Sequence, residues 1–247
     1  MKQLRGVILV AKREIGDMFL SPLVYVTAAL FLVIVGWLFF NYILSSQEWN
    51  QQTMTLSVVV PTFGIMNFLL MFLTPLITMR SFAEERKLQT LDLLFMSDLS
   101  ELQIICGKLL STFVSMFFML SLTLIFPIVL AVSGYSNWSV IGMGYLGLMF
   151  SILCYLSAGL FASSLTENQI IAAILGFSIL MGQMLLIISA NATENYLMAQ
   201  MLQYLSLAYH YEVFSRGAIK TYNIVYYFSF IGFFTYLTWI SLKSRRW

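Results

Sequence analysis

Charged side chains gather in one short segment of this sequence. Arg80–Gln103 holds eight charged residues, although the whole chain has only 13 Lys and Arg and 11 Asp and Glu, and long apolar runs flank it on both sides. Because a charge is costly within lipid, the segment must lie in water or against another protein. Leu88, Leu91 and Phe95 fall on one side of a predicted helix, so that side needs a partner. A loop that rests on lipid headgroups is the alternative interpretation.

Two capping-box patterns divide this charged segment. Ser81-x-x-Glu84 and Ser100-x-x-Gln103 each place a hydroxyl three residues before a Glu or Gln, which is the spacing of a helix N-terminus. We therefore expect one short helix that begins near Phe82 and a second helix that leads into the next apolar run.

Few residues elsewhere could perform catalysis. His210 is the only histidine, and its neighbouring tyrosines favour a hydrogen-bonded residue at the membrane interface over a ligand or a proton switch. Cys106 and Cys154 lack metal-ligand spacing and adjoin apolar runs, so we expect them to be small hydrophobic fillers. The sequence predicts a protein that is not an enzyme and has no cofactor or metal of its own.

Gly107-Lys108 superficially matches the end of a phosphate-binding loop. That motif needs a glycine at position 102, where the chain has Leu, and a Ser or Thr at position 109, where it has Leu again. The chain therefore lacks this nucleotide site, and we interpret the dipeptide as a feature of the start of a helix.

The composition places the chain in a bilayer. Hydrophobic residues make up 60% and charged residues 10% of the sequence, and the mean hydropathy is +0.86, whereas a soluble domain has about 25% charged residues. The net charge of +2 is too small to indicate a nucleic-acid partner. The expected fold class is an all-α membrane protein.

Uncharged runs predict six transmembrane helices. The longest run greatly exceeds the roughly 20 residues that cross a hydrocarbon core, and turn-forming residues in SGYSNWS (133–139) divide it in two. Ser21-Pro22 has the pattern of a helix start. The predicted spans are about 22–45, 56–79, 109–133, 139–164, 169–190 and 223–242.

The basic residues predict the orientation in the membrane. Eleven Lys and Arg lie before the first span, between spans 2 and 3 or after span 6, against Arg216 and Lys220 in the opposite loops. By the positive-inside rule, we expect both termini in the cytoplasm. The first span is too long for a signal peptide, so we expect it to be retained.

Two segments outside the spans have helical apolar faces. Residues 1–20 predict an amphipathic helix on the inner membrane surface, with a basic tail of no defined structure as the alternative. Residues 191–222 predict a segment that dips into the outer interface, with a surface-lying helix as the alternative. The apolar face of the first comprises Leu4, Val7, Ile8, Ala11, Ile15, Met18 and Phe19, and that of the second Leu197, Met198, Met201, Leu202 and Leu205.

Four stretches together resemble the permease subunits of ABC-2 type transporters, especially the gliding-motility type. They are REIGDMFLSPLVYV (13–26), RSFAEERKLQTLDLLFMSDLSELQ (80–103), GLFASSLTENQIIAA (159–173) and YHYEVFSRGAI (209–219). The resemblance implies a single domain over 1–247 with the type V exporter fold. It also implies a cytoplasmic coupling region at 80–106 and short re-entrant helices between spans 5 and 6.

The resemblance further implies partners and site residues. An ABC ATPase subunit would bind ATP and Mg. A second permease subunit, identical or related, would complete the pathway along spans 2 and 5. Membrane lipid and an auxiliary extracytoplasmic subunit are further expected partners. The location would be the bacterial inner membrane. The residues expected to meet the ATPase or to shape its docking site are Arg80, Ser81, Glu84, Glu85, Arg86, Thr90, Asp92 and Leu93. Those expected in the outer re-entrant segment are Tyr209, His210, Glu212, Arg216 and Gly217.

Three positions depart from the family pattern. Gln89 stands where glycine is usual, Asp92 replaces a glutamate, and Asp98 occupies a position where proline is common. Because Gln is a better helix former than Gly, the first change favours a more continuous helix. The absence of proline leaves the geometry of the corner open.

The predicted spans contain no ionisable Asp, Glu, Lys, Arg or His residue, which an ion-driven carrier would need. We therefore expect another subunit to supply the energy, as in an ATP-driven exporter linked to motility or secretion. A membrane scaffold that transmits force but transports nothing is the alternative. The spans have too few polar residues for a wide aqueous channel. Lipid, polysaccharide, peptide and small drug all remain open as substrates.

Overall fold

The computed structural model describes residues 2–46, 50–90, 96 and 99–244, and in these ranges the chain folds into helices. Six segments within the described ranges are long and apolar enough to cross a membrane, which confirms the predicted number. The helices are α1 (Lys2–Leu20), α2 (Pro22–Ser45), α3 (Gln51–Met54), the π-helix η1 (Thr55–Val59), α4 (Val60–Lys87), α6 (Glu101–Leu122), α7 (Ile125–Val132), α8 (Trp138–Leu165), α9 (Gln169–Ala192), α10 (Tyr196–Leu205), α11 (Leu207–Ser215) and α12 (Thr221–Lys243).

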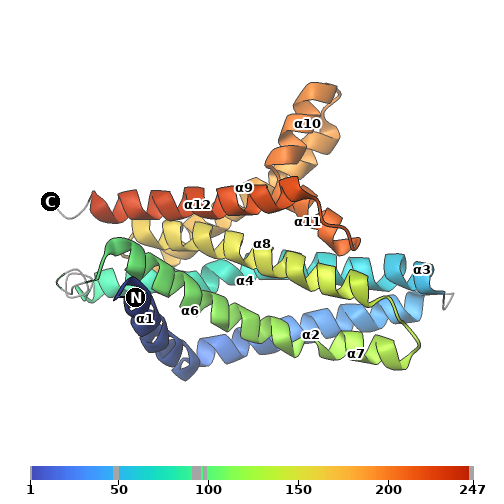
Figure 1. Cartoon of the computed structure of the whole chain (residues 1–247), viewed down its shortest axis with the longest axis horizontal. Coiled ribbons are helices and arrows are strands. Elements are labelled where there is room, and N and C mark those ends of the chain that lie inside the picture. Colours follow the sequence, from blue (N-terminus) through green and yellow to red (C-terminus); the bar gives the residue numbers. More distant parts are fainter. Residues whose placement is uncertain (1, 47–49, 91–95, 97–98, 245–247) are drawn as a thin grey trace.

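The long helices run side by side, and α1 is inclined to them (Figure 1). The start of α1, the end of α4, the start of α6 and the end of α12 lie at one end of the bundle, which we call the charged end (Figure 1). The turn between α7 and α8 and the short helices α10 and α11 lie toward the other end, and α10 projects from the body.

Several helix boundaries agree with the sequence prediction. Ser21 is the N-cap of α2, accepts a hydrogen bond from the Leu23 N–H and precedes Pro22 in the first turn. Ser100 caps α6 and forms the predicted capping box with Gln103. Residues 133–137 of the SGYSNWS segment form the turn between α7 and α8, and Trp138 begins α8.

The second span is longer than predicted. The segment α3–η1–α4 is one helical stretch of 37 residues, and at about 1.5 Å per residue it exceeds the roughly 30 Å thickness of a hydrocarbon core. Because α4 continues to Lys87, the prediction of a separate helix beginning near Phe82 is wrong. Ser81 lies inside α4, and its hydroxyl caps no helix. Phe82 is fully buried, so tertiary packing continues the helix where the local pattern predicted a start.

The third span is divided, although the sequence predicted one helix over 109–133. Helix α6 begins earlier, at Glu101, and ends at Leu122, and α7 follows from Ile125. Pro127 explains the break, because its ring has no N–H and clashes with the carbonyl group four residues earlier, which belongs to Thr123. The Thr123 hydroxyl lies 3.0 Å from the Tyr145 hydroxyl, which ties the break to α8.

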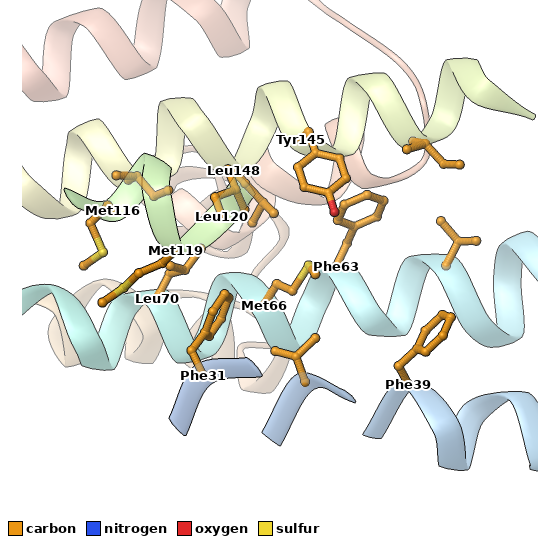
Figure 2. Packing of buried hydrophobic residues seen from close by; sticks show 14 of the residues in the cluster. Phe31, Phe39, Phe63, Met66, Leu70, Met116, Met119, Leu120, Tyr145 and Leu148 are labelled. Carbon is orange, nitrogen blue, oxygen red and sulfur yellow. The ribbon is translucent and has the colours of Figure 1, made fainter. Parts of the chain in front are cut away.

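The main core lies between α2, α4, α6 and α8. Figure 2 shows Phe31 from α2, Met66 and Leu70 from α4, Met119 from α6 and Leu148 from α8 pointing toward one another. Helix α8 is the most buried span, whereas α9 and α12 are largely exposed. This core holds α2, α4, α6 and α8 together, and a second cluster that includes Leu180 of α9 and Tyr227 of α12 packs these two helices against α8.

Candidate functional site: a buried charge cluster

A fully buried lysine lies at the charged end, between three helices. The side chain of Lys108 in α6 is 1% exposed, and its Nζ lies 3.0 Å from Glu14 Oε1 in α1 and 2.9 Å from Glu85 Oε1 in α4. The same Nζ lies 5.2 Å from the centre of the Phe82 ring. One ammonium group therefore joins α1, α4 and α6.

A second cation, the exposed side chain of Arg13, contacts the same two glutamates. Arg13 Nη2 lies 3.3 Å from Glu14 Oε1 and 3.1 Å from Glu85 Oε1, with the Arg13 side chain 57% exposed. The Oε1 atom of each glutamate therefore lies between an arginine and a lysine, and charges of opposite sign alternate. We call Arg13, Glu14, Glu85 and Lys108 the charge cluster. A buried charge is tolerated only with such partners, because desolvation alone costs several kcal/mol.

Close packing of α1 on α6 positions the charge cluster. Gly107 precedes Lys108, and a Cβ at that position would lie 2.8 Å from the Val10 side chain. The glycine therefore lets α1 approach the backbone of α6. Val10 and Glu14 are one helical turn apart on α1, so the same contact face carries an apolar residue and the carboxylate.

The end of α4 adopts the Schellman motif. The Thr90 N–H donates to the Glu85 carbonyl and the Gln89 N–H donates to the Arg86 carbonyl. Gln89 has a φ of +57°, the left-handed conformation that favours glycine. The inference that Gln89 makes the helix more continuous is wrong, since the helix ends there. The hydrogen bonds that close the motif outweigh the propensity of Gln.

The structure separates the residues expected to couple to an ATPase. Ser81 and Arg86 are buried, the Glu85 side chain is 12% exposed and belongs to the charge cluster, and Glu84 is half-buried. The other four expected coupling residues lie outside the charge cluster or outside the described ranges. Arg80 donates to the Ser21 hydroxyl between α1 and α2, Thr90 closes α4, and Asp92 and Leu93 lie outside the described residues. Leu91, Phe95 and Asp98 also lie outside them.

Sequence reasoning missed Glu14 and Lys108. Lys108 lies within α6, so the interpretation of Gly107-Lys108 as the start of a helix is wrong. A lysine beside an apolar run has no special pattern, and its partners are 94 and 23 positions away. The glycine just before it was the one local sign, because glycine permits two helices to approach closely.

A cavity of about 1000 Å³ opens beside the charge cluster, between α1, the start of α2 and the end of α4. A second cavity of about 330 Å³ lies between α4, α9 and α11 toward the other end. Asn67 and Gln183 line the second cavity, and Asn67 accepts a hydrogen bond from Tyr155 in α8. This hydrogen bond joins α4 to α8.

The predicted outer residues lie on or just after α11. His210 is 2% exposed, its Nδ1 lies 2.8 Å from Asn223 Oδ1 and its Nε2 lies 2.9 Å from the Tyr204 carbonyl oxygen. His210 is thus hydrogen-bonded on both sides. Tyr209 packs against it, Glu212 and Arg216 form an exposed ion pair, and Gly217 ends α11 with a φ of +82°.

The neighbour of His210 on α11, Tyr211, reaches back to α4. Its hydroxyl donates to the Phe63 carbonyl, and burial raises its pKa well above the usual value, so the phenol keeps its proton. This bond ties α11 to the wall of the second cavity.

Other chemistry has little support in the described ranges. No group of three or more His, Cys, Asp or Glu residues there could hold a metal ion. Cys154 is fully buried, as expected of a filler, but Cys106 is exposed on α6. The cysteine prediction therefore holds for Cys154 alone.

Six helices in the described ranges are long and apolar enough to cross a membrane, and they define a multi-pass membrane protein. A family model described as ABC-2 family transporter protein matches residues 41–243. The chain therefore belongs to this family. A comparison with curated proteins finds no match.

Proposed function

We propose that the chain is the permease subunit of an ATP-driven exporter, whose ATP is hydrolysed by a separate ABC ATPase subunit that also binds Mg. The family is one of membrane transport components. The charge cluster carries the proposal, because it connects three helices at the end where an ATPase would dock. The cluster lies at the margin of the membrane-crossing segments, so it is suited to transmit force.

The docking surface is the exposed end of α4. Lys87, Leu88 and Gln89 are exposed there, with 64% of Leu88 accessible, and Glu84 is half-buried one turn earlier. An aliphatic side chain between polar ones suits a protein interface. Glu85 and Arg86 are turned away from this surface, and Glu85 acts by holding α1 and α6 to this end.

Force at the docking surface would move α1, α4 and α6 together. Separating them would expose or unpair Lys108, and breaking a buried pair costs about 3–5 kcal/mol. ATP-driven closure of the ATPase dimer would therefore shift the three helices as one unit and switch access to the pathway between two states.

The second cavity belongs to the proposed pathway. It lies between α4 and α9, the second and fifth spans, and carries the polar groups of Asn67 and Gln183 in a largely apolar wall. A second permease chain, identical or related, would face these helices, and α10 and α11 would close the outer end as re-entrant helices.

The charged end would face the cytoplasm of a bacterium, with the bundle in the inner membrane and α1 on its inner surface. The basic residues beside this end support that orientation. Participation in a gliding-motility or secretion machine, with an auxiliary extracytoplasmic subunit, completes the proposal and rests on the resemblance of the four sequence stretches.

Co-purification with the ABC ATPase subunit tests the docking surface. The double variant Lys87→Ala/Leu88→Ala should weaken ATPase binding by more than about tenfold, since exposed residues at an interface centre dominate affinity. Ile219→Ala/Lys220→Ala changes a matched exposed pair at the other end and should bind normally. Normal binding and ATPase rates for the first variant would contradict the proposal, and ATP-dependent assembly without transport would favour a scaffold.

A further inference from the structure

The wall of the cavity at the charged end has an apolar part and a charged part. Leu9, Leu23, Val24 and Ile77 form an apolar part, and acidic and basic side chains form the rest. Its volume of about 1000 Å³ lies at the top of the usual range for ligand pockets, about 300–1000 Å³. The cavity also adjoins the start of a membrane span, so an amphiphile can reach it from the lipid.

Two buried oxygen atoms in this wall have no hydrogen-bond partner in the described part of the chain. They are Ser81 Oγ and Glu85 Oε2, and Ser81 is only 4% exposed. A buried polar atom without a partner is destabilising. A carboxylate oxygen can only accept, so the missing group must be a donor, and a positively charged donor is preferred beside a carboxylate.

The basic side chains in the wall could bind an anionic group of the same ligand, beside its positively charged donor. Arg80 contributes one nitrogen to the Ser21 hydroxyl and is exposed, and Arg13 binds both glutamates through Nη2 while over half of its side chain is exposed. A guanidinium has five N–H donors, in a geometry that matches phosphate. Asp17 and Glu84 in the same wall add acceptors for an ammonium group.

We propose that this cavity binds a membrane phospholipid whose headgroup carries a primary amine. The ammonium group donates to Glu85 Oε2 and Ser81 Oγ, the phosphate binds Arg13 and Arg80, and an acyl chain lies along Leu23 and its apolar neighbours. Such a lipid completes the hydrogen bonding of the charge cluster and stabilises the junction of α1, α2 and α4. The cavity wall shares Glu84 and Leu88 with the proposed docking surface, but the lipid binds the chain without the substrate or the ATPase.

Lipid-dependent stability of the purified, delipidated full chain tests the site. Nanodiscs of dioleoyl-phosphatidylcholine, with or without dioleoyl-phosphatidylethanolamine, have the same acyl chains, but the choline group has no N–H donor. Phosphatidylethanolamine should raise the melting temperature, and native mass spectrometry should show a bound molecule retained on the chain. Equal stability and equal retention of the two lipids would overturn the proposal.

Two variants locate the effect in the cavity. Ser81→Ala removes an oxygen without a partner, so the delipidated chain should melt at the same temperature or higher, while affinity for phosphatidylethanolamine falls about tenfold. Leu23→Trp should fill the apolar part and also weaken binding. Ser157→Ala changes a serine buried in α8, away from this cavity, and should leave the lipid effect intact. Unchanged lipid affinity in both cavity variants would overturn the proposal.

Soluble phosphoethanolamine distinguishes the source of the amine. The proposal predicts that phosphoethanolamine at the same headgroup concentration stabilises the chain far less than the lipid, because it lacks acyl chains. Equal stabilisation would overturn the assignment to a lipid.

Discussion

At the residue scale, the charge cluster uses four side chains to fix the position of α1. A buried ion pair adds little net stability compared with apolar residues of the same size, but it is costly to break by removal of one partner. Lys108 is the member whose loss matters most, since it contacts both glutamates and is almost inaccessible to water.

Replacement of Lys108 by Met tests this role. The change leaves two carboxylates beside Arg13 alone, so the free energy of unfolding should fall by about 3–5 kcal/mol in detergent denaturation followed by tryptophan fluorescence. The triple variant Glu14→Gln/Glu85→Gln/Lys108→Met removes the charges together and should recover most of that loss. Equal stability of the single variant and the wild type would contradict the account.

Gln89 gives a second residue-scale prediction. Gly134 and Gly217 occupy the corresponding left-handed position after α7 and α11, with the same two backbone hydrogen bonds, whereas α4 uses Gln. Gln89→Gly should raise the free energy of unfolding by about 1 kcal/mol, because glycine adopts this conformation without the cost of a Cβ. Gln200→Gly, in the middle of α10, should lower it by about 1 kcal/mol. A fall in both variants would refute the left-handed assignment.

At the element scale, α4 connects the charged end to the cavity at the other end, and α8 supports it. Ser163 in α8 donates to the Met79 carbonyl and accepts from the Phe82 and Ala83 N–H groups, at distances of 3.1 Å. These contacts lie just before the charged end of α4, after Pro75 removes one backbone donor from the helix. The serine therefore stabilises the part of α4 that would transmit force.

Ser163→Ala should weaken this support. Loss of three hydrogen bonds to buried backbone groups should lower the free energy of unfolding by about 1–2 kcal/mol. It should also speed hydrogen–deuterium exchange at Phe82 and Ala83. Ser157→Ala is the matched control, because Ser157 is equally buried in α8 but bonds only within its own helix. Identical exchange at Phe82 in the two variants would contradict this role.

The sequence was sufficient for the number and order of the spans, because long uncharged runs and the SGYSNWS turn are local patterns. It was insufficient where distant contacts or backbone closure decide the outcome. The extension of α4 past Phe82 depends on packing, and the end at Gln89 depends on a hydrogen-bonded closure that Gln does not favour. The break before Pro127 was readable in principle, since proline disrupts the preceding turn.

The candidate site was only partly predictable for the same reason. Glu84 and Glu85 were both expected to couple to the ATPase, but the structure turns Glu85 inward and leaves Glu84 half-buried beside the surface. Their different roles depend on Lys108, which reaches α4 only when α1, α4 and α6 have packed. No spacing rule along the chain contains that information.

At the scale of the whole molecule, both ends of the described chain and the charge cluster lie at one end, and the cavity between α4 and α9 lies toward the other (Figure 1). Helix α10 has no buried residue, and Leu197 and Met201 on it are more than 60% exposed. This arrangement suits a subunit that receives force at one end and uses it at the other, with lipid or a second chain against its apolar surface.

Distances between spin labels on Lys12, Leu76 and Lys243, each replaced by Cys, test the central claim most directly. Leu76 is an exposed residue of α4 outside the docking surface, and Cys106, which is also exposed, is first replaced by Ser. In the complex with the ATPase, ATP should change the Leu76–Lys243 distance by about 2 Å or more and leave the Lys12–Leu76 distance unchanged, because the charge cluster holds α1 to α4. No ATP-dependent change in the Leu76–Lys243 distance, or the same change without the ATPase, would contradict the account.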